Sequence, residues 1–358
     1  MTTKVWQPGD LFVWLAVGLP LVTWLPLVSH DPSVSVTSNP LFVWVIGGIA
    51  GLGLLLAVRD WWLGLWVAWT ALTQMWTGTI HGFEEIELTA FGAWALVMVR
   101  EMNTEKHTLI IRLLLVGAAV QVVYGFGQMV GYDPLWMGLA HFEGATAAQG
   151  SLGNPNYYGV YLAMLIPLAP LWLAVLLFAG LLSSKCALGL IAACVGLAVQ
   201  HRHQIGRAVL LVAILASGWV LVGKDWYSAR HRMDVWTLAL QDTQGWQWLI
   251  GHGPGSWIER IPQLQVNAKV WAHSLFAQAH NDPLQLLYTG GAISVVLLTL
   301  WFWSHRAMFT GRYGGAVAAV LVGAGGIFTF RLAIPAATAI VLLGLATSKE
   351  GLRHDAMA

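Results

Sequence analysis

Long apolar segments occupy most of this chain, and they constrain its fold more than any other feature. Eleven of them approach the length of about 17 to 25 residues that a helix needs to cross a bilayer. Within the hydrocarbon, backbone amides have no water to bond to, so only helices and closed barrels are stable there. The segments lack the polar–apolar alternation of barrel strands, so we expect helices. Their approximate bounds are 10–28, 41–58, 61–80, 88–102, 108–130, 156–182, 184–200, 206–223, 284–304, 313–330 and 332–347.

The composition agrees with a membrane protein. Hydrophobic residues make up 57% of the chain and charged residues 10%, whereas a soluble domain carries roughly a quarter charged residues. We therefore expect an all-α fold, a polytopic transmembrane helical bundle of about ten to twelve helices. It should form a single membrane domain over residues 1–358, with a larger external loop subdomain at 224–283 and a smaller external loop at 131–155.

The distribution of charged and metal-binding residues limits the partners. The net charge is +1 and the 18 Lys and Arg residues are dispersed, so nucleic acid is not an expected partner, whereas the lipid bilayer is. Cys186 and Cys194 lie in one apolar run and should pack there. The histidines have no cysteine or carboxylate at ligand spacing. We therefore predict no metal site and no cofactor.

The positive-inside rule predicts the side of each short loop. The loops that contain Lys or Arg should face the cytoplasm. They are the loops at Arg59 and at Lys185, and the segments 100–112, 305–312 and 349–353. The loops that contain neither, which should face outward, are 29–40, 81–87 and 131–155.

The two flanks of the polar segment 224–283 predict different sides for it. Counting back from the basic 305–312 turn crosses one span and places the segment outside, whereas counting forward through 206–223 delivers Lys224 to the cytoplasm. One apolar run is therefore not a simple span: either 206–223 is re-entrant, or 184–200 or its neighbour is wrongly segmented. We place the segment outside, with an even number of crossings and both termini inside.

Two apolar runs begin with the same kind of helix start. Asn154 precedes Pro155 and Asn156, and Asn281-Asp282 precedes Pro283. The ordinary explanation is that Asn or Asp caps the helix and Pro occupies its first turn. The functional explanation is that these N-termini present free amides and a positive dipole end to an anion.

Two arginines and one histidine are expected on the outer side with these helix starts. Arg207 lies at the end of an apolar run, and Arg232 opens an amphipathic segment that contains Trp236. Arginines at this depth commonly contact lipid headgroups, but two guanidinium groups beside helix N-termini also suit a diphosphate. His280 directly precedes Asn281, where it has either a structural role or the role of a proton acceptor.

The glycine-rich segment 251–255, Gly-His-Gly-Pro-Gly, is only superficially like a phosphate-binding loop. It lacks the Lys-Ser/Thr pair of a P-loop and follows no predicted strand, so nucleotide binding is not expected. A tight turn that lies close to another backbone explains the glycines better.

The order of these motifs resembles that of the O-antigen ligase and polymerase superfamily of bacterial envelope glycan enzymes. The resemblance covers about residues 150–291, and the N-terminal third agrees only in hydropathy. Two features depart from the family pattern: Gly206 stands where a serine is common, and the chain is too short for an extra hairpin that usually precedes the external loop. The matching positions are Gly153-Asn154-Pro155-Asn156, Arg207-Ala208, Arg232 with Trp236, Gly251 to Gly255, and His280-Asn281 with Leu284 and Gly290-Gly291.

This resemblance implies a metal-independent, inverting glycosyltransferase that moves a glycan from a polyprenyl diphosphate carrier to the hydroxyl of an acceptor glycolipid or glycan. It implies a multi-pass protein of the bacterial inner membrane, acting in lipopolysaccharide biosynthesis on the periplasmic or external face. The implied catalytic residues are His280, as the base, with Arg232 and Arg207 on the diphosphate. The implied substrate-binding residues are Asn154, Asn156, Trp236, Asn281, Gly253 and Gly255.

Other functions fit parts of the same pattern. A repeat-unit polymerase or a protein oligosaccharyltransferase would share the chemistry and differ in the acceptor. A transporter would place ionisable residues at mid-bilayer on interrupted helices, whereas this chain keeps them at loops and helix ends. A non-catalytic scaffold would tolerate substitution of Arg232 and His280.

Overall fold

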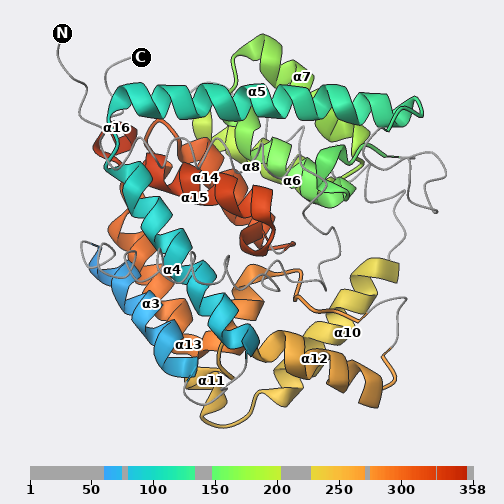
Figure 1. The fold of residues 1–358 in the computed structure, drawn as a ribbon, viewed down its shortest axis with the longest axis vertical. Coiled ribbons are helices and arrows are strands. Elements are labelled where there is room, and N and C mark those ends of the chain that lie inside the picture. Colours follow the sequence, from blue (N-terminus) through green and yellow to red (C-terminus); the bar gives the residue numbers. More distant parts are fainter. Residues whose placement is uncertain are drawn as a thin grey trace.

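The computed structural model describes residues 60–74, 80–133, 147–202, 227–270, 275–327 and 329–352. Every regular element within these ranges is a helix (Figure 1), which confirms the all-α prediction. The longer elements are α3 (Trp61–Thr73), α4 (Ile80–Arg100), α5 (Thr104–Met129), α6 (Pro155–Leu165), α7 (Leu171–Ser183), α8 (Ala187–Gln200), α10 (Tyr227–Asp242), α12 (Ser256–Asn267), α13 (Asp282–Ser304), α14 (Gly314–Ala324) and α15 (Ala333–Thr347). The shorter elements are η3 (Gly150–Leu152), η4 (Ile166–Leu168), α11 (Gln247–Ile250), η5 (Arg306–Phe309), η6 (Thr329–Arg331) and α16 (Lys349–Leu352).

The basic loops gather at one end of the bundle, which we call the basic end. Arg100 donates to the carboxylate of Asp60 over 2.7 Å, and the guanidinium of Arg202 donates to the carbonyl oxygen of Phe309 over 3.3 Å. The amide of Arg312 donates to the carbonyl oxygen of Gly351. The loops at 100–112, 305–312 and 349–353 therefore lie together at one end of the bundle, and their cytoplasmic side stays a prediction.

The opposite end, which we call the Asn281 end, holds the starts of α6, α8 and α13. The side-chain amide of Asn281 donates to the carbonyl oxygen of Gly325 over 3.0 Å, and Arg232 donates to that of Gly326 over 3.2 Å. The thiol of Cys186 lies 3.7 Å from the carbonyl oxygen of Asn156. The described part of the predicted outer loop 131–155 therefore lies away from the basic end, as expected.

The apolar run 156–182, predicted as one span, forms two antiparallel helices, α6 and α7 (Figure 1). Pro167 and Pro170 cause the break, because proline lacks an amide donor and disfavours a helical residue before it. The two helices return to the same end, where the amide of Ala148 donates to the carbonyl oxygen of Ser183. Lys185 therefore lies at the Asn281 end, and its predicted place with the cytoplasmic basic loops is wrong.

This hairpin removes the conflict between the two predicted sides of the polar segment. Because α7 returns to the Asn281 end, α8 leads to the basic end, where the amide of Gly315 donates to the side chain of Gln200. Arg202, the last described residue before 203–226, lies at the basic end. Arg232, in the next described range, lies at the Asn281 end. The extra pass that charge counting required lies in 156–182, the neighbour of 184–200, so the alternative of a wrongly segmented neighbour is the one that the structure supports. The re-entrant alternative concerns 206–223, which lies outside the described residues.

Two of the described helices, α5 and α13, are long and apolar enough to cross a membrane. Several others are apolar but shorter, including α7, α8 and α14. The α13 helix is itself kinked at Gly291, whose φ is 66°. Prolines and glycines have therefore divided the apolar runs into shorter helices than the run lengths predicted.

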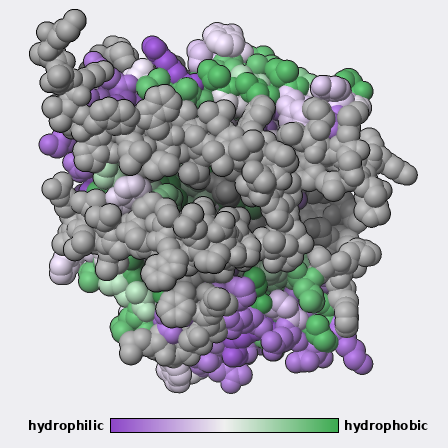
Figure 2. All heavy atoms as spheres, viewed as in Figure 1, coloured by the Kyte–Doolittle hydropathy of each residue, from purple (hydrophilic) through white to green (hydrophobic). Residues whose placement is uncertain are grey.

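Apolar side chains are exposed along the outer faces of α5 and α7, where Figure 2 shows a hydrophobic surface. Leu171 is 82% exposed, Trp172 71% and Val123 65%. An exposed apolar surface of this kind on a helix hairpin suits contact with lipid.

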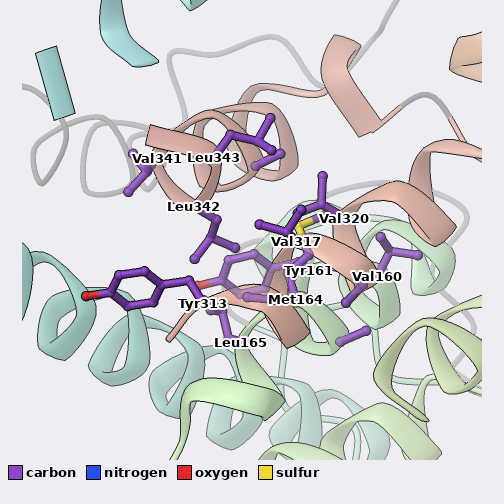
Figure 3. Packing of buried hydrophobic residues seen from close by; sticks show 14 of the residues in the cluster. Val160, Tyr161, Met164, Leu165, Tyr313, Val317, Val320, Val341, Leu342 and Leu343 are labelled. Atoms are coloured by element: carbon purple, nitrogen blue, oxygen red, sulfur yellow. The ribbon is translucent and has the colours of Figure 1, made fainter. Parts of the chain in front are cut away.

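The described helices enclose two hydrophobic cores. The larger core lies between α6, α14 and α15, where Tyr161 and Leu165 pack near Val317 and Leu342 (Figure 3). The smaller core joins α10, α12 and the first half of α13 through buried residues such as Val235, Trp257, Ile261, Ala279 and Tyr288. The described part of the polar segment therefore packs around a separate small core, to which the start of α13 also contributes.

Candidate functional site

The α10 helix presents Arg232 and Trp236 on one face, because residues four apart are neighbours on a helix surface. One terminal nitrogen of Arg232 donates to the carbonyl oxygen of Gly326. Its buried Nε has no hydrogen-bond partner among the described residues. Burial lowers the pKa of this guanidinium, but an arginine remains charged. A desolvated cation with an unused donor is suited to receiving an anion.

The indole of Trp236 is hydrogen-bonded to the backbone beside His280. Its indole N–H donates to the carbonyl oxygen of Ala279 over 2.6 Å. Its predicted role as a substrate ligand stays a prediction, but its polar group already has this structural partner.

His280 has a left-handed backbone conformation, with φ 53°, which is uncommon for a residue with a side chain. Its ring packs edge-on against Phe276 with ring centroids 5.2 Å apart, and Phe276 in turn contacts His231. Burial, and secondarily the charge of Arg232, lowers the pKa of His280 to about 3. The imidazole is therefore neutral at physiological pH, the state in which it can accept a proton.

The predicted Asn154 cap is present, whereas α13 is capped by Asn281, one residue before the Asp282 that the Asn-Pro and Asp-Pro pattern indicated. The side-chain oxygen of Asn154 accepts from the amide of Asn156 over 2.8 Å, and that of Asn281 accepts from the amide of Leu284 over 2.9 Å. Proline occupies the first turn of each helix. The ordinary capping explanation is confirmed, and substrate binding by Asn154, Asn156 and Asn281 stays a prediction.

Six of the nine predicted site residues lie together at the Asn281 end, namely Arg232, Trp236, His280, Asn281, Asn154 and Asn156. Arg232 is within electrostatic range of His280 and of Tyr157 in the first turn of α6. Asn156 joins this group through its contact with Cys186, which is also within electrostatic range of Arg232. The start of α6 and the start of α13 are thus brought to one arginine, as the sequence predicted.

The start of α8 also belongs to this site, although Cys186 was not among the predicted site residues. Cys186 caps α8, its sulfur accepting from the amide of Gly189 over 3.2 Å. The signal was present in the sequence, because Pro167 and Pro170 show that a helix must end and another begin before Cys186. With α8 included, three helix N-termini lie around Arg232.

Of the other three predicted site residues, the structure describes Gly253 and Gly255, which lie away from Arg232 in the turn against α13. Arg207 lies outside the described residues. The amide of Gly253 donates to the carbonyl oxygen of Thr289 over 2.8 Å, and a Cβ on Gly255 would lie 2.4 Å from the amide nitrogen of Gly82. The prediction of a tight turn against another backbone is confirmed. The turn meets α13 eight residues after Asn281, about 12 Å along the helix axis.

A second polar cluster surrounds Asp242 at the end of α10. Arg260 donates to both carboxylate oxygens of Asp242, over 2.8 and 3.0 Å, and the hydroxyl of Tyr288 donates over 2.7 Å. His252 stacks on Tyr288 and lies 3.7 Å from the same carboxylate. Burial tends to raise the pKa of Asp242, but the hydrogen bonds from Arg260 and Tyr288, with the charges of Arg260 and His252, together lower it. The sequence gave no local signal for this cluster.

In the described part of the chain, no group of three histidine, cysteine or acidic side chains is placed to hold a metal ion. A comparison with protein-family models gave no match, and a comparison with curated proteins gave none either. The site combines a desolvated guanidinium, three helix N-termini and a neutral imidazole.

Proposed function

We propose that the protein is a membrane glycosyltransferase that transfers an oligosaccharide or polysaccharide from a polyprenyl diphosphate carrier to an acceptor hydroxyl. The observation that carries the proposal is the position of Arg232 close to His280, beside the N-termini of α6 and α13. The guanidinium of Arg232 suits binding of the diphosphate, and the imidazole of His280 suits removal of the proton from the acceptor hydroxyl. The order of the motifs, which resembles that of O-antigen ligases, supports the same conclusion.

The chemistry would be a single displacement. The acceptor oxygen forms a bond to the anomeric carbon, and the bond from that carbon to the diphosphate oxygen breaks. The electron pair leaves on the diphosphate, whose charge is stabilised by Arg232 and by the helix N-termini in a partly desolvated site. The acceptor proton passes to the imidazole of His280. One displacement inverts the anomeric centre and calls for no metal or covalent intermediate.

The low pKa of His280 fits this scheme only when the donor is bound. A base with a pKa of about 3 holds a proton weakly at neutral pH. A diphosphate bound at Arg232 would offset the charge that disfavours the imidazolium, and would add a negative charge that favours it. The donor would therefore raise the basicity of His280 where the acceptor is activated.

The proposed location is the bacterial inner membrane, with a multi-pass bundle of ten or twelve crossings and the Asn281 end on the periplasmic or external face. The concentration of Arg100, Arg202, Arg306 and Arg312 at the basic end supports this orientation under the positive-inside rule. The proposed acceptor is a glycolipid, as in lipopolysaccharide biosynthesis. A repeat-unit polymerase would use a growing glycan instead.

The test is transfer by the purified protein, reconstituted with a polyprenyl-diphosphate oligosaccharide and measured in EDTA. Glycolipid, carrier-linked glycan and peptide acceptors are offered separately, and the products are identified by mass. Arg232→Ala and His280→Ala should each lower kcat by roughly 100-fold or more, the range found when a charge-stabilising donor or a general base is removed.

Two matched variants control for charge and fold. Arg230→Ala removes an exposed arginine from the same helix as Arg232, and His201→Ala removes a histidine at the basic end. Both should transfer at the wild-type rate. Full activity of Arg232→Ala and His280→Ala would refute the residue assignment. Movement of the carrier-linked glycan across proteoliposomes without any transfer product would favour a transporter instead.

A further inference from the structure

The segment from Phe276 to His280 is held in an unusual way. It contains no regular helix or strand, yet the backbone polar groups of Phe276 and Ala279 are bound by side chains from three helices. The amide of Phe276 donates to Gln265 over 2.8 Å, and its carbonyl oxygen accepts from the indole of Trp257 over 3.2 Å. Both of these partners belong to α12.

Ala279 is held in the same manner. Its amide donates to the side-chain oxygen of Gln285 in α13 over 2.9 Å, and its carbonyl oxygen accepts from Trp236 in α10. Gln285 is fixed in turn, because its side-chain nitrogen donates to Gln278 over 2.8 Å. Gln265, Gln285 and Trp257 are each at most 1% exposed, so these hydrogen bonds are shielded from water and difficult to replace.

These contacts surround a strained residue. His280 follows Ala279 directly and has φ 53°, a conformation that costs free energy for a residue with a Cβ and persists only where its surroundings impose it. The side chain of Phe276 contacts the His280 ring at the same time. Backbone strain of this kind occurs where a side chain must be presented in one orientation.

We propose that Trp236, Trp257, Gln265 and Gln285 are positioning residues, which hold Phe276 and Ala279 so that the imidazole of His280 is presented beside Arg232. The catalytic consequence rests on the proposed glycosyl transfer, but the structural consequence does not. In this proposal, Trp236 binds the protein backbone at Ala279 and not the substrate.

The ionisable groups around His280 come from two of the elements that hold it. Arg232 and His231 belong to α10, and Asp282 lies two residues further along at the start of α13, where its carboxylate accepts from the amide of Phe330. A change in the orientation or solvent exposure of His280 should therefore change its titration, because burial and the charge of Arg232 are what hold its pKa low.

The experiment compares Trp236→Phe and Gln285→Leu with wild type in detergent micelles. The side-chain NMR signals of the 12 histidines are recorded against pH, and the signal of His280 is assigned by its loss in His280→Gln. In the wild type this signal should not titrate above about pH 4. In both variants its midpoint should rise by roughly one unit or more toward 6.5. In the transfer assay, kcat should fall roughly tenfold or more, with KM for the donor within about twofold.

The matched controls are Trp248→Phe and Gln263→Leu, which make the same changes at exposed positions of α11 and α12, and both should behave as wild type. If His280 titrates as in wild type in both Trp236→Phe and Gln285→Leu, the positioning role is refuted. If the wild type transfers no glycan, the proposed function fails, while the shift in the His280 midpoint still supports or refutes the positioning role. Trp236→Phe preserves the aromatic packing, so it supplies the result if Gln285→Leu does not fold.

Discussion

Gly251 and Gly291 lie backbone against backbone. A Cβ on Gly251 would come within 2.6 Å of the amide nitrogen of Gly291, and a Cβ on Gly291 within 2.5 Å of that of Gly251. Both residues have positive φ, 77° and 66°. This contact fixes the turn after α11 to the kink in α13, and so attaches the polar segment to a helix of the bundle.

We therefore expect Gly251→Ala and Gly291→Ala each to lower the free energy of unfolding by about 2 to 4 kcal/mol, from backbone strain together with overpacking. Gly245→Ala is the control, because Gly245 also has positive φ but nothing lies within 4 Å of its Cβ position. It should cost only about 1 kcal/mol. Thermal unfolding in detergent measures the difference, and equal losses at the three positions would contradict the close contact.

Asp242→Ala should destabilise the polar segment by about 1 to 3 kcal/mol, because the buried hydroxyl of Tyr288 loses its acceptor. The folded-state pKa of Asp242 is lowered, so its contribution is present above the unfolded pKa of about 4 and is lost as the pH falls through the folded value. The variant should lack this loss at acid pH. Asp234→Ala, at an exposed position of α10, should have little effect in the same unfolding measurements.

His280 should make stability depend on pH in the mildly acidic range. Its pKa is about 3 in the folded protein and about 6.5 when unfolded, so the unfolded chain binds the extra proton between these values. Stability should fall as the pH drops from about 6.5 toward 3, by up to about 1.4 kcal/mol for each pH unit. Unfolding of His280→Gln should show a shallower dependence over this range; an unchanged slope would argue against a buried, neutral imidazole.

Asp60→Asn should be among the most damaging substitutions at the basic end. The carboxylate of Asp60 accepts from Arg100 over 2.7 Å and from the indole of Trp301 over 2.9 Å, and its side chain is 4% exposed. Loss of the Asp60 charge leaves the largely buried Arg100 with only the exposed carboxylate of Glu101 nearby, at a cost of about 3 kcal/mol. Glu101→Gln is the matched control, because Glu101 contacts the same arginine but is 53% exposed. Its effect in thermal unfolding should be about 0.5 kcal/mol or less.

The α6–α7 hairpin predicts that Lys185 and Arg202 lie on opposite sides of the membrane. A membrane-impermeant maleimide added to intact cells should label Lys185→Cys, whereas Arg202→Cys should be labelled only after permeabilisation. Native Cys186 and Cys194 are buried, so the parent protein should give little background. Labelling of both positions from the same side would contradict the hairpin.

Much of the helical architecture and part of the site were predictable from local sequence. Asn154 caps its helix as expected, and the 251–255 turn lies against another backbone, whereas the cap of α13 is Asn281, one residue before the expected Asp282. The split of 156–182 was also encoded locally, by Pro167 and Pro170, but hydropathy counting treats proline between leucines as part of one run. Such signals were accessible because each depends on neighbouring residues.

Other contacts had no local signal. Asp242 meets Tyr288 across 46 positions of sequence, and Trp236 meets Ala279 across 43. Neither pair follows from periodicity or capping, because each forms only when α10 and α13 pack against a shared core.

The sequence by itself determined that this chain is helical and largely apolar, that most of its basic loops share one end, and where several helices begin. These properties follow from hydrogen bonding within a segment and from the charge of short loops. Only the tertiary structure decided that α7 packs back against α6 after the break at Pro170, that α8 begins beside Arg232, and that His280 is neutral. Those outcomes depend on burial and on the packing of distant helices, since the charge state of an imidazole is set by whatever surrounds it after folding.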